Sequence, residues 1–155
     1  MRTVEKFLAD RSSAVFGVVA ATPGQASVLR YRLPELGYVV REVRGAKMPT
    51  VGAVFDEFAA AFQFPDYFGE NKDAFDECMR DLEEFVGAAK GYVVVVRDAA
   101  QLLRDEPAER AWFADAMAFY ASEWSNRADP VVFRVVLLDR SGSVPIDGER
   151  LALKA

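Results

Sequence analysis

The chain has 155 residues, 52% of them hydrophobic, and a formal net charge of −5, which suits one globular domain with a sizeable core. It has no histidine, which excludes a Ser–His or Cys–His nucleophile, an imidazole base and a histidine metal ligand. The acidic balance and the lack of a basic tract argue against direct nucleic-acid binding, and no apolar run reaches the roughly 20 residues of a membrane span.

The first part of the chain contains two segments that favour β-structure. "AVFGVVAA" (14–21) is apolar and β-branched, and "TPGQ" follows it, which predicts a strand and a turn. "ASVLRYRLPELG" predicts a helical turn or two that end at Gly37. "YVVREV" (38–43) predicts a second strand, which Gly45 stops.

Two helices are expected in the middle of the chain. The first spans 50–62 with Thr50 as its N-cap, and its apolar residues recur at helical spacing. The second spans 71–86 as one continuous helix with Asn71 as its N-cap. Its buried stripe comprises Phe75, Cys78, Met79, Leu82, Phe85 and Val86. Asp73, Glu77 and Glu84 are expected on the opposite side of that helix.

The last third completes an alternation of strands and helices. "YVVVV" (92–96) is apolar throughout, as in a strand that is buried on both faces. A helix with an aromatic stripe is expected from about Pro107, and "VVFRVVLL" (131–138) predicts another strand. The tail after it could add a hairpin around "DG". This order predicts a small α/β domain with a mostly parallel sheet.

The acidic residues are concentrated in "FPDYFGENKDAFDECMRDLEEF", residues 64–85. This segment holds eight carboxylates and only Lys72 and Arg80 as cations, a local charge of −6, so the rest of the chain sums to +1. One interpretation is a solvated polar face. The aromatic loop that precedes the charges favours another, a protein-binding surface, since an aromatic beside fixed charge is typical of interaction hot spots.

The segment "FPDYFGENKDAFDECM" resembles the barstar family of intracellular ribonuclease inhibitors. The family pattern is a Pro-acid-Tyr-aromatic-Gly-x-Asn-x-Asp-Ala loop and helix start, followed by an acid and a cysteine. It is matched without a gap by Pro65, Asp66, Tyr67, Phe68, Gly69, Glu70, Asn71, Asp73, Ala74 and Cys78. A weaker match extends from about residue 38 to 139.

The resemblance implies a three-stranded parallel sheet with packed helices over 38–139. Residues 1–37 would be an extension that adds a strand at one sheet edge and a turn or helix, and 140–155 a tail, all within a single domain over 1–155. The resemblance also implies an inhibitor that blocks the basic active site of a ribonuclease or toxin nuclease, with its carboxylates in place of substrate phosphates. The partner-binding residues would be Tyr67, Gly69, Asn71, Asp73, Asp76 and Glu77.

Three positions depart from the family pattern. Glu77 stands where Asp is frequent, Asp76 stands where an aromatic residue is common, and Ala121 stands near the place of a further glutamate, with Glu123 close by. These departures keep an alternative open, a structural or regulatory interaction domain of the same fold without a ribonuclease target.

Other expectations follow from the composition. The lone Cys78 lies on the apolar stripe, so we expect a buried structural thiol, and a single cysteine suits a cytoplasmic protein. The resemblance implies an immunity protein, and we expect a monomer when it is free. We expect no enzymatic activity, cofactor or metal. A cation site on Asp73, Asp76 and Glu77 is the weaker alternative, because no EF-hand spacing or phosphate-binding loop accompanies them.

Overall fold

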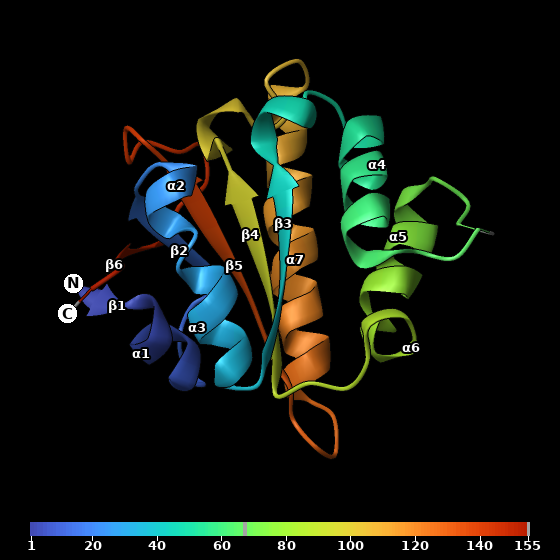
Figure 1. Cartoon of the computed structure of the whole chain (residues 1–155). Coiled ribbons are helices and arrows are strands. Elements are labelled where there is room, and N and C mark those ends of the chain that lie inside the picture. The colour runs from blue at the N-terminus through green and yellow to red at the C-terminus, as the bar shows by residue number, and fades with distance from the viewer. Residues whose placement is uncertain (67, 155) are drawn as a thin grey trace.

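The computed structural model describes residues 1–66 and 68–154, and it shows helices packed on both faces of one parallel sheet (Figure 1). The sheet has six strands in the order β1-β6-β2-β5-β4-β3, and every neighbouring pair is parallel. The strands are β1 (Arg2–Thr3), β2 (Phe16–Ala20), β3 (Tyr38–Arg44), β4 (Gly91–Arg97), β5 (Val132–Asp139) and β6 (Glu149–Ala152).

The helices form two layers, one on each side of the sheet (Figure 1). The α-helices are α1 (Val4–Ala9), α2 (Pro23–Ala26), α3 (Leu29–Glu35), α4 (Val51–Phe62), α5 (Lys72–Met79), α6 (Leu82–Val86) and α7 (Arg110–Ser125). Short 3₁₀ turns occur at η1 (Gly45–Lys47), η2 (Ala99–Gln101) and η3 (Pro107–Glu109). Helices α4 to α7 cover the larger core, and α1 to α3 cover a smaller one on the other face.

The central strands are buried on both faces, as their sequences predict. Along β4, Val94 and Val96 pack into the larger core, whereas Val93 and Val95 pack into the smaller one. This alternation follows from the two-residue period of a strand, and it explains why the segment is apolar at every position. The predicted caps of α4 and α5 are also confirmed, since Thr50 accepts from the Ala53 amide and Asn71 from the Ala74 amide.

The expectation of a three-stranded sheet is wrong in the number of strands. The segment 38–138 supplies three adjacent strands, but the complete sheet has six. β2 does not simply extend an edge, because it pairs with β5 over Phe16–Ala20 on one side and with β6 on the other. The physical reason is that β2 is apolar on both faces and requires a covering helix layer on each side.

The tail does not form a hairpin around "DG". Its strand β6 runs parallel to both β1 and β2, and it carries Leu151 into the smaller core. Parallel neighbours cannot be joined by a tight turn, so the tail crosses from β5 past β2 to reach this position.

The expected continuous helix over 71–86 is also wrong, because the chain breaks between α5 and α6. The freed carbonyl groups at the end of α5 are satisfied by side chains from α7 and the turn after it. Trp124 Nε1 donates to the Met79 carbonyl at 2.9 Å, and Arg127 donates to the Arg80 carbonyl. Tertiary hydrogen bonds here replace the next helical turn, so Glu84 does not share a helix with Asp73.

No helix in residues 1–66 and 68–154 is long and apolar enough to cross a membrane.

The turn after β3 requires a glycine, which makes a matched pair of substitutions informative. A Cβ at Gly45 would lie 2.4 Å from the Asp98 carbonyl oxygen, whereas a Cβ at Gly52, in the first turn of α4, meets only Thr50 Oγ1 at 3.9 Å. Gly45→Ala should therefore lower the free energy of unfolding by about 1–3 kcal/mol. Gly52→Ala should raise it by up to about 1 kcal/mol, and urea unfolding of both variants measures the difference. Equal stability of the two variants would contradict this account of Gly45.

Candidate functional site

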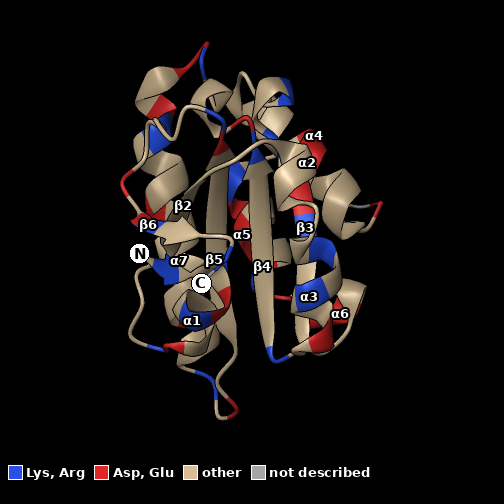
Figure 2. Ribbon diagram, turned by 60° about the vertical axis from the view of Figure 1, so that its left-hand side comes forward, with Lys and Arg blue, Asp and Glu red and all other residues tan. Residues whose placement is uncertain are grey.

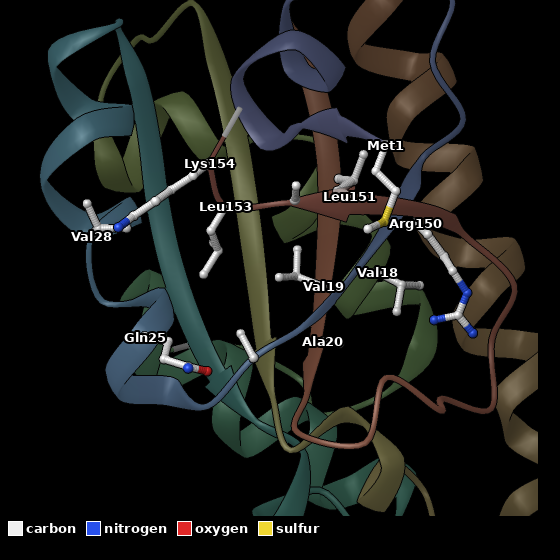
Figure 3. A pocket seen from close by; sticks show the side chains of 12 residues that line it. Met1, Val18, Val19, Ala20, Gln25, Val28, Arg150, Leu151, Leu153 and Lys154 are labelled. Atoms are coloured by element: carbon white, nitrogen blue, oxygen red, sulfur yellow. The ribbon is translucent and has the colours of Figure 1, made fainter.

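Six exposed carboxylates lie on α5 and α6 and in the segments that adjoin them, and we call this set the acidic face. It consists of Asp66, Glu70, Asp73, Glu77, Asp81 and Glu84. None of the six has an ion-pair partner among the described residues. Figure 2 shows the acidic residues of α5 and α6 in red against a fold with mixed charge elsewhere. The face therefore presents uncompensated negative charge to solvent.

The loop before α5 is held down by aromatic packing. The Phe64 and Phe68 rings lie 5.1 Å apart, and Phe68 packs on Phe55 at 5.9 Å. Both residues are partly buried and pack against the larger core. Tyr67, the expected contact residue between them, lies outside the described residues.

The start of α5 is shaped by Asn71 and Gly69. Asn71 Oδ1 accepts from the Ala74 amide at 2.8 Å, and its Nδ2 donates to the Gly69 carbonyl at 3.3 Å. Glu70 between them adopts a left-handed backbone conformation with φ of 50°, which is uncommon for a residue with a side chain. Asn71 therefore uses its side chain to fix the helix start and the loop conformation.

Helix α5 separates its buried and charged residues cleanly. Phe75 and Met79 are fully buried, and Cys78 is buried as expected. Burial raises the pKa of the Cys78 thiol, with a further contribution from Glu77, so the less reactive protonated form is favoured. On the other side, Asp73 and Glu77 are exposed one helical turn apart.

Asp76 differs from its two acidic neighbours, because it is partly buried and paired. The hydroxyl of Tyr120, on α7, donates to Asp76 Oδ1. Burial and this hydrogen bond raise the pKa of Tyr120 well above its ordinary value, which keeps the donor protonated. Tyr120 belongs to the aromatic stripe of α7 and is fully buried. Its bond to Asp76 was missed, since the sequence does not show which helices meet.

The two cations of the acidic segment are held by acids outside it. Lys72 Nζ lies 2.9 Å from Glu109 and 4.9 Å from the centre of the Trp112 ring. Arg80 lies 3.4 Å from Glu123, the residue noted near the place of the family's further glutamate. Both pairs join the segment to α7 and the turn before it, and they leave the acidic face without a compensating cation of its own.

A polar hollow of about 600 Å³ lies at the junction of α5 and α7. It is lined by Glu77, Arg80, Asp81, Glu123, Asn126 and Arg127. The carboxylates of Glu77 and Asp81 reach it from the acidic face. Because Arg80 and Arg127 line it together with three carboxylates, the hollow carries both hydrogen-bond donors and acceptors.

In the described parts of the chain, one cluster of three acidic residues has oxygen atoms close enough together to hold a metal ion. Oxygen atoms of Asp81, Glu83 and Glu84 lie within 4.8 Å of one another. However, Glu83 also pairs with Arg127 at 3.2 Å, and Asp81 and Glu84 are exposed. Asp73, Asp76 and Glu77, the oxygen set considered from the sequence, are not brought together in this way. The arrangement fits a charged surface.

Helix α5 displays Asp73 and Glu77 to solvent, on an α/β domain with one parallel sheet. Residues 38–138 match the family described as Barstar (barnase inhibitor). This match covers most of the chain, including the acidic face, and the chain belongs to the barstar family. No curated protein sequence matches the chain. The family name denotes inhibitors of a ribonuclease, not enzymes.

The contact between Tyr120 and Asp76 can be tested by removing the hydroxyl. Loss of a hydrogen bond to a charged group costs about 1.5–3 kcal/mol. Tyr120→Phe should reduce the free energy of unfolding by an amount near the lower limit of this range, because the partly exposed Asp76 can bind water instead. Tyr31→Phe is the matched control, since Tyr31 is 71% exposed. Urea unfolding compares the two variants. A Tyr120→Phe protein as stable as the control would show that the bond does not hold α5 to α7.

Proposed function

We propose that the protein inhibits a cationic ribonuclease or toxin nuclease by covering its active site with the acidic face. The observation that carries the proposal is the pair Asp73 and Glu77, two exposed carboxylates without a cation among the described residues, inside the segment that matches the family of barnase inhibitors. Such a pair can replace the phosphates of an RNA substrate in a basic active site. Arg and Lys side chains bind carboxylate and phosphate with the same donors.

The fold supports this role by fixing the carboxylates in place before binding. Asp73 and Glu77 project from a helix whose opposite side is fully buried at Phe75 and Met79. The helix is capped by Asn71 at its start and bonded to Trp124 at its end. Little conformational freedom of the backbone is then lost on binding, which favours affinity.

The six expected contact residues contribute in different ways under this proposal. Asp73 and Glu77 supply charge, whereas Gly69 and Asn71 shape the loop so that the partner can approach the start of α5. Asp76 acts through its bond to Tyr120 and positions the helix. Tyr67 keeps its proposed role as the aromatic contact.

The protein acts by binding under this proposal, with no catalytic step of its own. A cation site on the carboxylates would be an alternative basis for activity, and calorimetric titration with Mg²⁺ and Ca²⁺ separates the two. Turnover that depends on a metal and is abolished by Asp73→Asn would contradict the inhibitor proposal.

One observation favours the second candidate, an interaction domain without a ribonuclease target. The hollow that Glu77 lines also contains the guanidinium groups of Arg80 and Arg127, so the surface there is of mixed charge and less suited to a purely basic active site. The two candidates are distinguished by whether the protein binds basic nucleases at all. Barnase is the first probe, tested by calorimetry and by inhibition of RNA cleavage. A pull-down with the immobilised protein, followed by a ribonuclease assay of the eluate, extends the test to other targets.

Association with a basic nuclease should be fast and sensitive to salt. Charge on one face makes a directional field, which raises association rates about 10- to 10³-fold in steered complexes, the barnase–barstar pair among them. The Debye length falls from about 30 Å at 0.01 M salt to about 10 Å at 0.1 M. The association rate in stopped-flow measurements should therefore drop about tenfold or more over this range. A rate that stays flat would show that the acidic face does not steer the partner.

A substitution on the acidic face should change stability and binding in opposite directions. Glu77→Ala removes the repulsion with Asp73 and a negative charge near the C-terminus of α5, and these effects favour the free fold by roughly 0.2–0.5 kcal/mol or more. In a complex, truncation of a buried charge pair costs about 2–5 kcal/mol, a range that includes data from barnase–barstar. Glu77→Ala should thus unfold at equal or higher urea concentration but bind on the order of 30-fold more weakly.

Glu84→Ala is the control for this experiment. Glu84 is exposed and belongs to the same acidic face, but it lies on α6, beyond the break that follows α5. It should lose much less binding than Glu77→Ala. If Glu77→Ala destabilises the fold and leaves nuclease binding unchanged, the acidic face has a structural role and the inhibitor proposal fails.

A further inference from the structure

A cavity beside the first residues of β5 contains two arginines and no acidic residue. Its volume is about 200 Å³, and it is lined by Arg11, Ser125, Pro130, Val131, Val132 and Arg134. It shares no residue with the acidic face, and the proposed inhibitor function makes no use of it.

Arg134 occupies a position at which an apolar residue is expected. It lies in β5 between Phe133 and Val135, and by strand alternation it points to the same side as Val136, toward the smaller core. Its register partner in β4 is Val93, which is fully buried. Arg134 itself is only 5% exposed, and it is one of two buried polar residues in the described chain.

The hydrogen bonds of Arg134 leave its charge without a counter-ion. Nη1 donates to the Phe133 carbonyl at 2.8 Å and Nη2 to the Arg11 carbonyl at 3.2 Å, whereas Nε has no partner. Within the described residues, no carboxylate forms an ion pair with it. The charge of Asp10 acts favourably on Arg134 from a distance, but its carboxylate is bound to Arg2 at 2.7 Å. A buried cation without a directly paired carboxylate is unfavourable, so an anion that enters this cavity gains a favourable interaction with Arg134.

The other walls of the cavity specify the kind of anion. Arg11 is exposed, and its guanidinium forms no hydrogen bond or ion pair within the described residues, so it is free to bind. Pro130, Val131 and Val132 add an apolar wall. At about 30 Å³ per water molecule, the cavity has room for about seven waters or for an organic acid of a few carbons.

We propose that this cavity binds a small organic carboxylate. The planar guanidinium of Arg134 matches a carboxylate with parallel N–H donors, and Arg11 binds the same group from the solvent side. The hydrocarbon part of the ligand packs on Pro130, Val131 and Val132. The carboxylate belongs either to a free acid or to the end of a peptide chain.

Thermal unfolding of the full chain in sodium propionate tests the proposal, with sodium chloride at equal ionic strength as reference. Propionate should raise Tm with a saturable dependence on concentration, because a ligand that binds only the folded state stabilises it. Arg134→Met should remove this response. Arg11→Ala should raise the half-saturating concentration roughly tenfold, equivalent to about 1.4 kcal/mol. Arg140→Ala, at an exposed position directly after β5, should respond as the parent does.

Several outcomes would overturn the assignment. They are equal Tm changes in propionate and chloride, an unchanged half-saturating concentration in Arg11→Ala, and tighter binding of inorganic phosphate than of propionate. If Arg134→Met does not fold, Arg134→Lys keeps the charge without the planar fork and should also weaken propionate binding about tenfold. Binding of acetyl-alanyl-alanine more tightly than propionate would identify a chain end as the source of the carboxylate, and the reverse order a free acid.

Discussion

The packing of Phe75 against its aromatic neighbours holds the acidic face on the sheet. Its ring lies 5.2 Å from Phe58, 5.3 Å from Phe55 and 6.0 Å from Tyr120. Aromatic pairs of this kind contribute beyond the area that they bury, and they fix the relative orientation of the rings. Because the eight-residue helix α5 is too short to be stable alone, its position depends on this contact. The packing of Phe75 thus helps to set the orientation of α5 and of the carboxylates on it.

The acidic face itself contributes little to the stability of the fold. Its carboxylates repel one another, and the cations closest to it are paired with Glu109 and Glu123. In the free protein this repulsion is offset by the buried aromatic residues below. A surface that is unfavourable alone and favourable beside a cation is suited to a binding role, and the same charge makes binding depend on ionic strength.

The sequence predicted those parts of the structure that local patterns determine. The continuous apolar run of β4 and the Thr50 and Asn71 caps depend on neighbours in the chain, and all were confirmed. The break after α5 was not predictable, because the groups that replace the next helical turn come from Trp124 and Arg127. The pairing of Asp76 with Tyr120 was missed for the same reason. At the candidate site, the sequence was sufficient to predict the negative charge of residues 64–85. It could not predict which carboxylates have no ion-pair or hydrogen-bond partner, because those partners are distant in the chain.

The insertion of β2 between β5 and β6 also has a consequence for how the chain folds. Val18 of β2 pairs with Leu137 of β5, so the two central strands of the sheet are separated by about three quarters of the chain. Closing so long a loop is entropically costly, and contacts of high sequence separation slow folding. During synthesis β2 is made long before β5. Until β5 is made, the backbone groups on the edge of β2 that pairs with it have no partner strand. Helices α1 and α3, which contact the smaller core, cannot shield that edge, because they cover a face of the sheet. The arrival of β5 therefore completes the hydrogen bonding of β4 and gives β2 its first strand partner, whereas the other edge of β2 is paired only when β6 follows.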